Sequence, residues 1–244
     1  MVRIVAVSIL LALLFAAVLA PASLFGKFLF NESSELKLYN SAGTIWNGEA
    51  EVSWLKNRLG KTSWNINFQP LLSGVISYSN ILKGSKANVE MDIAADWDAN
   101  LTFLLNGIVQ PELLNRMLKN YRIQLFGEIS LENTEIKISE NRLFDLAGNI
   151  YWSGGPVTYE LSGFSLSSNL PAMTVNLGPE LTAFVYERDT GILLIRAEVM
   201  DTNFVKIGIT KGLSDLLGYP WPDKVDQNKI ILEVEEKLTN IRGL

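Results

Sequence analysis

The chain has 244 residues, a formal net charge of −5, and neither cysteine nor histidine. A nucleic-acid-binding protein needs Lys and Arg to neutralise phosphates, so this charge balance argues against that class. Without cysteine the chain can form no disulfide and no thiolate nucleophile. Without histidine it also lacks the other usual zinc ligand and the commonest general base.

An apolar segment occupies the N-terminus. Residues Ile4 to Phe25 include no charged side chain and, as a helix, span roughly 30 Å, the thickness of a hydrocarbon core. Arg3 precedes this segment, which favours a cytoplasmic N-terminus. We expect an uncleaved transmembrane anchor over residues 1–26 and a β-rich domain on the far side of the membrane over residues 27–244. The alternative is a signal peptide cleaved at Ala20-Pro21-Ala22, although the apolar run is longer than such peptides require.

Beyond the apolar segment, apolar and polar residues alternate, which is typical of strands with one buried face. In residues 89–98 the odd positions are apolar and the even positions are acidic, except for Ala94. Shorter runs of the same kind lie at 64–69, 128–132, 135–139 and 230–235, and residues 154–156 and 187–191 have the composition of turns. The sequence therefore predicts a mainly β fold: a curved, mostly antiparallel sheet, either an open groove or a sandwich.

One short helix is expected to interrupt the strands. It begins at Pro111, where a missing N–H has no cost, and its apolar face comprises Leu113, Leu114, Met117 and Leu118. We expect it to plug an end or edge of the sheet. A second short helix is expected at 213–217.

Residues 43–54 read GTIWNGEAEVSW. Gly48 is expected to permit a bulge that turns the chain into the sheet. After it, Glu49 and Glu51 alternate with Ala50 and Val52, so we expect the carboxylates to face water. The tryptophans Trp46, Trp54 and Trp64 are read as folding devices that supply buried area.

Residues 43–50, GTIWNGEA, resemble the signature G-T-[hydrophobic]-W-x-G-x-A of type II secretion system protein N. Two later segments, WNINFQPLLSG at 64–74 and LAGNIYWSGG at 146–155, resemble further segments of that family, which also has one N-terminal anchor. The positions taken as the family motif, and as candidate contacts, are Gly43, Thr44, Trp46, Gly48, Trp64, Pro70, Gly74, Gly148, Trp152 and Gly155.

This resemblance implies a single-pass inner-membrane protein of Gram-negative bacteria with its bulk in the periplasm. It implies an accessory role in the type II machine, which exports folded proteins through the outer membrane, and contacts with other subunits of that machine. The edge strands of the sheet could pair with a partner's sheet. No catalytic residue is carried over from the family.

A second hypothesis is a periplasmic protein that binds lipid or lipopolysaccharide in a groove. Bridge-like proteins of the AsmA kind, also anchored by one N-terminal helix, provide a fold-level analogy. One short helix cannot cover a sheet of some ten strands, so an open sheet would leave an apolar trough. The candidate lining residues are Val89, Met91, Ile93 and Trp97.

Signals for catalysis are weak. The pattern S-x-x-K occurs at 34–37 and 53–56, but the second copy lies in a strand-like run and neither has companion motifs. The acidic residues Glu90, Asp92, Asp96 and Asp98 could hold Ca²⁺, but their period indicates a solvated strand face. We expect no enzyme activity, and no catalytic, cofactor-binding or metal-binding residues.

Overall fold

The computed structural model describes residues 15, 16, 18–24, 35–54, 57–140, 142–161, 163–200, 204–219, 221 and 224–237. Most of the expected anchor, together with Ser34 and Lys56 of the two S-x-x-K patterns, lies outside these residues. Among the residues that are described, no helix is both long enough and apolar enough to cross a membrane.

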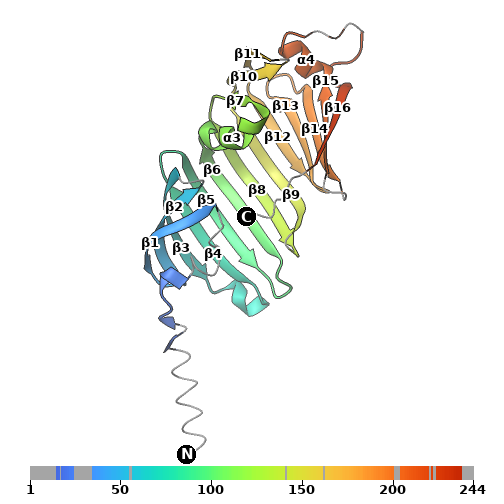
Figure 1. Ribbon diagram of the computed structural model, residues 1–244. Helices are drawn as coiled ribbons and strands as arrows, with labels where there is room; N and C mark the ends of the chain where they lie inside the picture. Colours follow the sequence, from blue (N-terminus) through green and yellow to red (C-terminus); the bar gives the residue numbers. More distant parts are fainter. Residues whose placement is uncertain are drawn as a thin grey trace, which may run out of the picture.

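The described strands form one large sheet and one small sheet (Figure 1). The large sheet has thirteen strands in the order β1-β2-β3-β4-β5-β6-β8-β9-β12-β13-β14-β15-β16, and every neighbouring pair is antiparallel. The small sheet has the order β11-β10-β7. The predicted antiparallel sheet is confirmed, with β1 and β16 as the edges of its described strands.

The bounds of the elements follow the chain. The strands of the large sheet are β1 (Leu36–Gly43), β2 (Asn47–Trp54), β3 (Asn57–Asn67), β4 (Ile76–Lys83), β5 (Ala87–Ala95), β6 (Leu101–Val109), β8 (Ile129–Ser139), β9 (Arg142–Trp152), β12 (Met173–Gly178), β13 (Thr182–Glu187), β14 (Leu193–Met200), β15 (Phe204–Thr210) and β16 (Ile230–Lys237). The remaining elements are β7 (Ile123–Leu125), β10 (Gly155–Leu161), β11 (Phe164–Leu170), the α-helices α3 (Pro111–Leu118) and α4 (Lys211–Leu216), and the 3₁₀ turns η1 (Pro70–Ser73) and η2 (Lys119–Tyr121).

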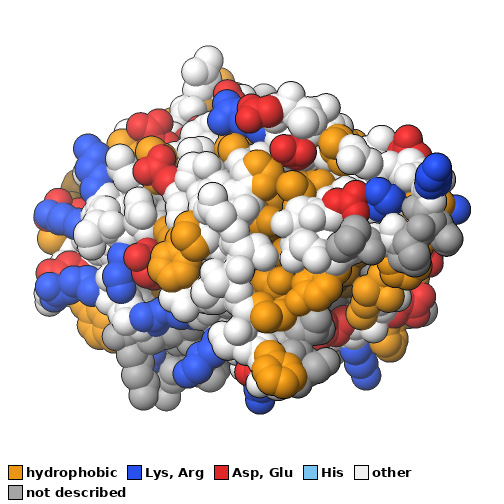
Figure 2. Space-filling model, turned by 90° about the horizontal axis from the view of Figure 1, so that it is seen from above, with side chains coloured by type: hydrophobic (Ala, Val, Ile, Leu, Met, Phe, Trp, Pro, Cys, Tyr) orange, Lys and Arg blue, Asp and Glu red, His pale blue; other side chains and the backbone are white. Residues whose placement is uncertain are grey.

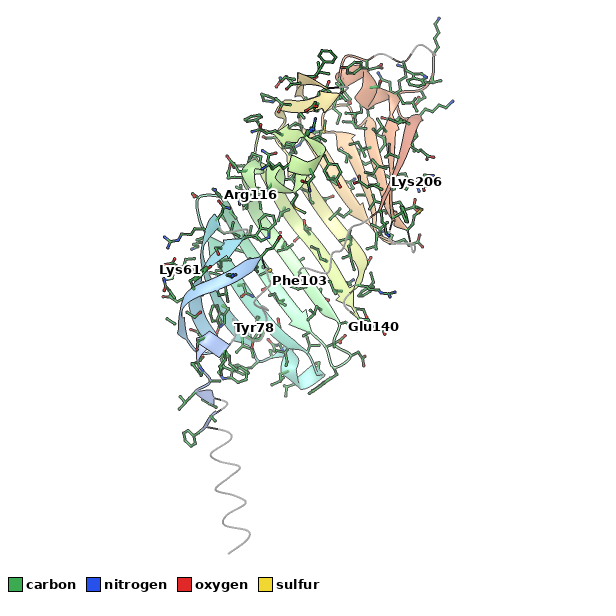
Figure 3. The ribbon with its side chains drawn as sticks, in the orientation of Figure 1. Lys61, Tyr78, Phe103, Arg116, Glu140 and Lys206 are labelled. Atoms are coloured by element: carbon green, nitrogen blue, oxygen red, sulfur yellow. The ribbon has the colours of Figure 1, made fainter. Side chains whose placement is uncertain are left out.

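The large sheet has an apolar face and a polar face. Directly opposed residues of neighbouring strands share a face. One such row runs through Tyr78, Ile93, Phe103, Ile136 and Leu146, from β4 to β9; Tyr78 and Phe103 are labelled in Figure 3. We call the side that carries this row the apolar face.

The opposite side, the polar face, carries rows of short polar and charged side chains. One row runs through Asn47, Asn65, Ser79 and Asp92, from β2 to β5. This division agrees with the alternation read from the sequence, because successive residues of a strand face opposite sides of the sheet.

Three elements cover part of the apolar face. Helix α3 places Leu113 in a cluster with Val52, Leu59 and Val89 of the sheet. The small sheet and α4 cover the later strands through a second cluster, whose buried members are Ile129, Trp152, Val157, Leu170, Met173, Leu194 and Leu213. Seen from the end at which α4 and β11 lie, hydrophobic side chains gather in the middle of the molecule, with charges mainly around them (Figure 2).

The rest of the apolar face stays partly exposed. Tyr78, Ile93, Phe103, Ile136 and Leu146 are neither buried nor fully exposed. The covering elements lie at the end of the strands where β6 stops and α3 begins, so the uncovered half lies toward the opposite end (Figure 1).

Both helix predictions are confirmed, with one correction. Helix α3 begins at Pro111 and sits at the end of β6, and α4 begins two residues before the expected Leu213. Met117, however, is exposed rather than part of the packed face of α3. The helix has only two turns, so Leu113 and Leu114 reach the neighbouring clusters while Met117 projects into solvent.

The expected strand over residues 89–98 is too long. Strand β5 ends at Ala95, and Asp96 begins a turn in which its carboxylate accepts hydrogen bonds from the N–H groups of Asp98 and Asn100, both at 2.9 Å. Trp97 therefore lies in a turn and not on the apolar face. Asp96 and Asp98 likewise do not continue the polar row of Glu90 and Asp92.

Candidate functional site

The first part of the motif is the turn between β1 and β2. The N–H of Thr44 donates to the carbonyl of Asn47 at 2.8 Å, and the Thr44 hydroxyl accepts from the N–H groups of Trp46 at 3.3 Å and Asn47 at 3.2 Å. Gly43 and Gly48 are directly paired across this turn. Thr44 is therefore a turn-forming residue whose hydroxyl replaces backbone partners.

Trp64 of β3 lies against the same turn. Its indole N–H donates to the Thr44 carbonyl at 3.1 Å, and the residue is only 3% exposed. Gly48 lies beneath the ring: a Cβ atom added at Gly48 would stand 2.6 Å from Cζ2 of Trp64. Ala50, next on the same face, is 1% exposed and belongs to the same cluster. The small residues of the motif thus make room for the indole.

This arrangement corrects the role expected for Gly48. The register between β1 and β2 is regular at Gly48 and shifts between Tyr39 and Ala42, where Asn40 has a φ of 51°. In the pairing of β2 with β3, the register shifts between Val52 and Ser53. Gly48 is required for the close approach of Trp64 and not for a bulge.

The turn also holds the segment that ends the N-terminal apolar run. The N–H of Ile45 donates to the Ala20 carbonyl at 3.0 Å, and Pro21 forms a β-bridge with Thr44. Ala22, at 1% exposure, packs with Ala50 and Trp64. The sequence contains an A-x-A pattern at Ala22 but no signal for this docking, because Ala22 packs against residues 28 and 42 positions further along the chain.

Three further predicted residues meet at another turn. Pro70 is the first residue of η1, and Gly74 ends it in the left-handed conformation with a φ of 81°. A Cβ atom at Gly74 would lie 2.1 Å from Nε1 of Trp97. Glycine is therefore needed at position 74 both for its backbone and for the indole that covers it.

The remaining motif residues lie in a separate place. Trp152, at the end of β9, is buried and donates from its indole N–H to the Phe126 carbonyl at 2.6 Å. Gly148 is in the middle of β9, and Gly155 opens β10. Strands β3 and β9 are separated by β4, β5, β6 and β8, a distance of about 24 Å at the usual strand spacing. The motif residues do not converge on one site.

The predicted groove residues are only partly brought together. Val89, Met91 and Ile93 share the apolar face, but Val89 is buried in the cluster that contains Leu113 of α3. Met91 and Ile93 remain partly exposed. Tyr78 lies beside Ile93, and burial raises the pKa of its phenol.

Ion pairs lie on the polar face. Glu49 pairs with Lys61 and Glu51 with Arg58, each at 2.7 Å and with substantial exposure. The solvated carboxylate face predicted for Glu49 and Glu51 is confirmed. Lys137 lies 3.1 Å from both Glu135 and Asp145, and its hydrogen bonds to these two carboxylates, first that to Glu135, raise its pKa.

The acidic residues show no metal-site geometry. Glu90 and Asp92 are exposed, with Asp92 accepting from the Ser79 hydroxyl at 2.6 Å. Across the described ranges, no three His, Cys, Asp or Glu side chains are grouped so that they could hold a metal ion.

A comparison with known protein families finds the same family that the motifs resemble. Residues 34–187 match the family described as Type II secretion system (T2SS), protein N. No curated protein and no solved structure gives a significant match. The match covers more than half of the chain and includes all of the motif positions. It makes the protein a component of the type II secretion system, in the cell envelope, with other secretion subunits as its partners, and the chain belongs to the T2SS protein N family.

Proposed function

We propose that the chain is an accessory, single-pass inner-membrane component of the type II secretion system. Residues 1–26 anchor it with the N-terminus in the cytoplasm, and residues 27–244 form the periplasmic domain. In this role it takes part in the export of folded proteins from the periplasm through the outer membrane, by contacts with other subunits and not by catalysis.

Two observations carry this proposal: the family match, and the docking of Ala20, Pro21 and Ala22 against the sheet. The uncharged run continues into residues that pack and hydrogen-bond against the sheet. Cleavage at Ala22 would remove the contacts of Ala20, Pro21 and Ala22 with the motif turn. This supports a retained anchor over a cleaved signal peptide.

Edge strand β1 supports the proposed contact with another subunit. Among the described strands it pairs with β2 alone, and Tyr39 on this strand is about half exposed. An unpaired strand edge offers its backbone groups to a partner strand. The edge lies beside the docked N-terminal segment.

A deletion strain tests the role, and crosslinking tests the contact. Export of the machine's substrates should fall on deletion and return with the wild-type chain. A photo-reactive residue at Tyr39 should give adducts with another secretion subunit, whereas one at Phe164, exposed on β11, should not. Normal export in the deletion strain would overturn the role, and equal adducts at the two positions would overturn the contact at β1.

A second candidate function is binding of lipid or lipopolysaccharide on the apolar face. A hydrogen bond of 2.9 Å joins the Tyr121 hydroxyl of η2 to Glu236 of edge strand β16. Tyr121 follows α3, which covers β2, β3 and β5. Strand β16 is at the opposite edge of the sheet, so the sheet must curve for Glu236 to reach Tyr121. Such curvature favours a trough lined by the exposed part of the apolar face, in the manner of AsmA-like proteins.

Photo-crosslinking in cells separates the two candidates. A reactive group at Met91 or Ile93 should give phospholipid or lipopolysaccharide adducts if the trough holds lipid. Adducts with secretion subunits at these positions would instead make the apolar face a protein contact and overturn the second candidate.

A further inference from the structure

Exposed apolar side chains gather at one end of the large sheet. Phe68, Leu71, Leu72 and Ile76 belong to the connection between β3 and β4 and the start of β4, and Trp97 belongs to the connection between β5 and β6. Leu72 is 95% exposed, Trp97 81% and Phe68 59%. We call these five residues the apolar rim. A patch of this kind on a folded protein usually marks an interaction site.

The rim is held in place by its backbone. Within η1 the N–H of Gly74 donates to the Leu71 carbonyl and the N–H of Val75 to the Pro70 carbonyl, both at 3.1 Å. The indole of Trp97 covers Gly74, and the carboxylate of Asp96 fixes the turn that carries Trp97. The fold therefore presents these side chains outward in defined positions, without burying them.

The rim is continuous with the segment that ends the N-terminal apolar run. The rings of Trp46 and Phe68 have centroids 6.1 Å apart, and the N–H of Ile66 donates to the Trp46 carbonyl at 2.7 Å. Trp46 lies in the same turn that binds Ala20 and Pro21. These connections all lie at the end of the sheet opposite α3 (Figure 1).

The chemistry of the rim fits the boundary between lipid head groups and acyl chains. Residues Thr62 to Leu82 include no charged side chain. Tryptophan is enriched at this boundary because its ring is apolar and its N–H is polar, and leucine and phenylalanine gain free energy by leaving water. A protein partner is less well supported. The uncharged apolar run of residues 4–25, the proposed anchor, would bring this end of the sheet to the membrane.

We propose that the apolar rim inserts into the periplasmic leaflet of the membrane that holds the N-terminal run. The end of the sheet that carries the β3–β4 and β5–β6 connections then contacts the lipid surface. This inference rests on the proposed anchor. The docked segment then sets the orientation of the sheet, and the rim gives it a second point of attachment. Both prevent the periplasmic domain from swinging freely about the anchor.

The cysteine-free chain allows a direct test. Full-length single-cysteine variants L13C, L72C and F164C carry a nitroxide and are reconstituted in vesicles of phosphatidylethanolamine and phosphatidylglycerol. Collision with oxygen, which concentrates in lipid, is compared with collision with a water-soluble nickel chelate. Position 164, on β11 at the other end of the molecule, is the matched exposed control at 72%.

The label at 72 should favour oxygen over nickel several-fold more than the label at 164, and the label at 13 should favour oxygen most. Equal, water-like values at 72 and 164 with a lipid-like value at 13 would overturn the rim proposal alone. A water-like value at 13 would overturn the anchor and the rim together. Spin–spin broadening at 72 would show instead that the rim pairs two copies of the chain, and would also overturn the proposal.

Discussion

Trp64 joins three parts of the chain that are distant in sequence. Its N–H bonds the Thr44 carbonyl, its ring lies on Gly48, and its cluster contains Ala50 and Ala22. In the sequence, Gly48 and Ala50 belong to one motif segment and Trp64 begins another, and nothing there links the two. Their purpose became clear only from the register, which pairs Trp64 with Gly48 across β2 and β3.

The variant Trp64→Phe should destabilise the protein by about 1–3 kcal/mol, because it removes the hydrogen bond and leaves the Thr44 carbonyl without that donor. The free energy of unfolding is measured by denaturant titration of the full-length chain in detergent. Trp97→Phe is the matched control and should change stability by less than about 0.5 kcal/mol, since its ring is exposed. Equal losses in the two variants would contradict the assigned role of Trp64.

Asp96 gives the turn that carries Trp97 a dependence on pH. Its hydrogen bonds, first that from the Asn100 side chain, lower the pKa of its carboxyl below the ordinary value. A lowered pKa in the folded state stabilises the fold above the unfolded-state pKa of about 3.9, and this contribution is lost as the pH falls through the folded-state pKa.

The stability difference between wild type and Asp96→Asn should therefore shrink as the pH is lowered from 7 toward 3. The midpoint of thermal unfolding, followed for both proteins in the same detergent, measures it. A difference that stays constant over this range would show that the charge of Asp96 does not hold the turn.

At the scale of single elements, the strands could be predicted well and their ends less well. Alternation placed Val89 to Ala95 correctly, because each residue's side of the sheet follows from a period of two. The same pattern failed at Asp96, because a side chain that can cap a turn looks identical in sequence to one that faces water. The turn at residues 187–191 was predictable from composition, and it ends at Gly191, which has a φ of 70°.

Helix α3 shows a similar limit. Its start at Pro111 was predictable, but its packing was only half predictable, because an amphipathic pattern gives a face without saying how much of it has a neighbour. The candidate site was even harder to predict from the sequence. The motif positions could be named, but their division into separate clusters depends on the strand order.

The two sides of α3 should respond differently to truncation. Leu113→Ala should cost about 2–5 kcal/mol, because Leu113 fills a buried cluster between the helix and β2, β3 and β5. Met117→Ala should cost less than about 0.5 kcal/mol, because Met117 is exposed. Denaturant titration of both full-length variants compares them, and a similar cost for both would mean that α3 does not cover the sheet through Leu113.

At the scale of the whole molecule, the sheet separates two environments. Its polar face carries ion pairs such as Lys206 with Glu233 and Lys61 with Glu49, while its apolar face is covered at one end by α3, α4 and the small sheet. Because α3, α4 and the small sheet cover only one end of the apolar face, the other end exposes apolar surface that a monomer in water would be expected to bury. A lipid held in the proposed trough would cover this area, and the proposed insertion of the apolar rim would bring the trough close to a source of lipid.

Charge placed on the two faces of one strand should separate a lipid trough from a structural surface. Phe103→Glu puts a carboxylate among Ile93 and Ile136 on the apolar face, whereas Thr102→Glu puts one beside Lys137 on the polar face. If the trough holds acyl chains, phospholipid that copurifies with the full-length chain in mild detergent should fall several-fold in F103E and stay at the wild-type level in T102E. The amount of bound lipid should fall because a charge placed among apolar groups and acyl chains has a high free-energy cost. Lipid mass spectrometry measures the amount, and equal unfolding midpoints for both variants exclude a loss of fold. An unchanged amount of lipid in F103E would contradict the lipid trough. A secretion subunit would then be the better candidate for covering the apolar face.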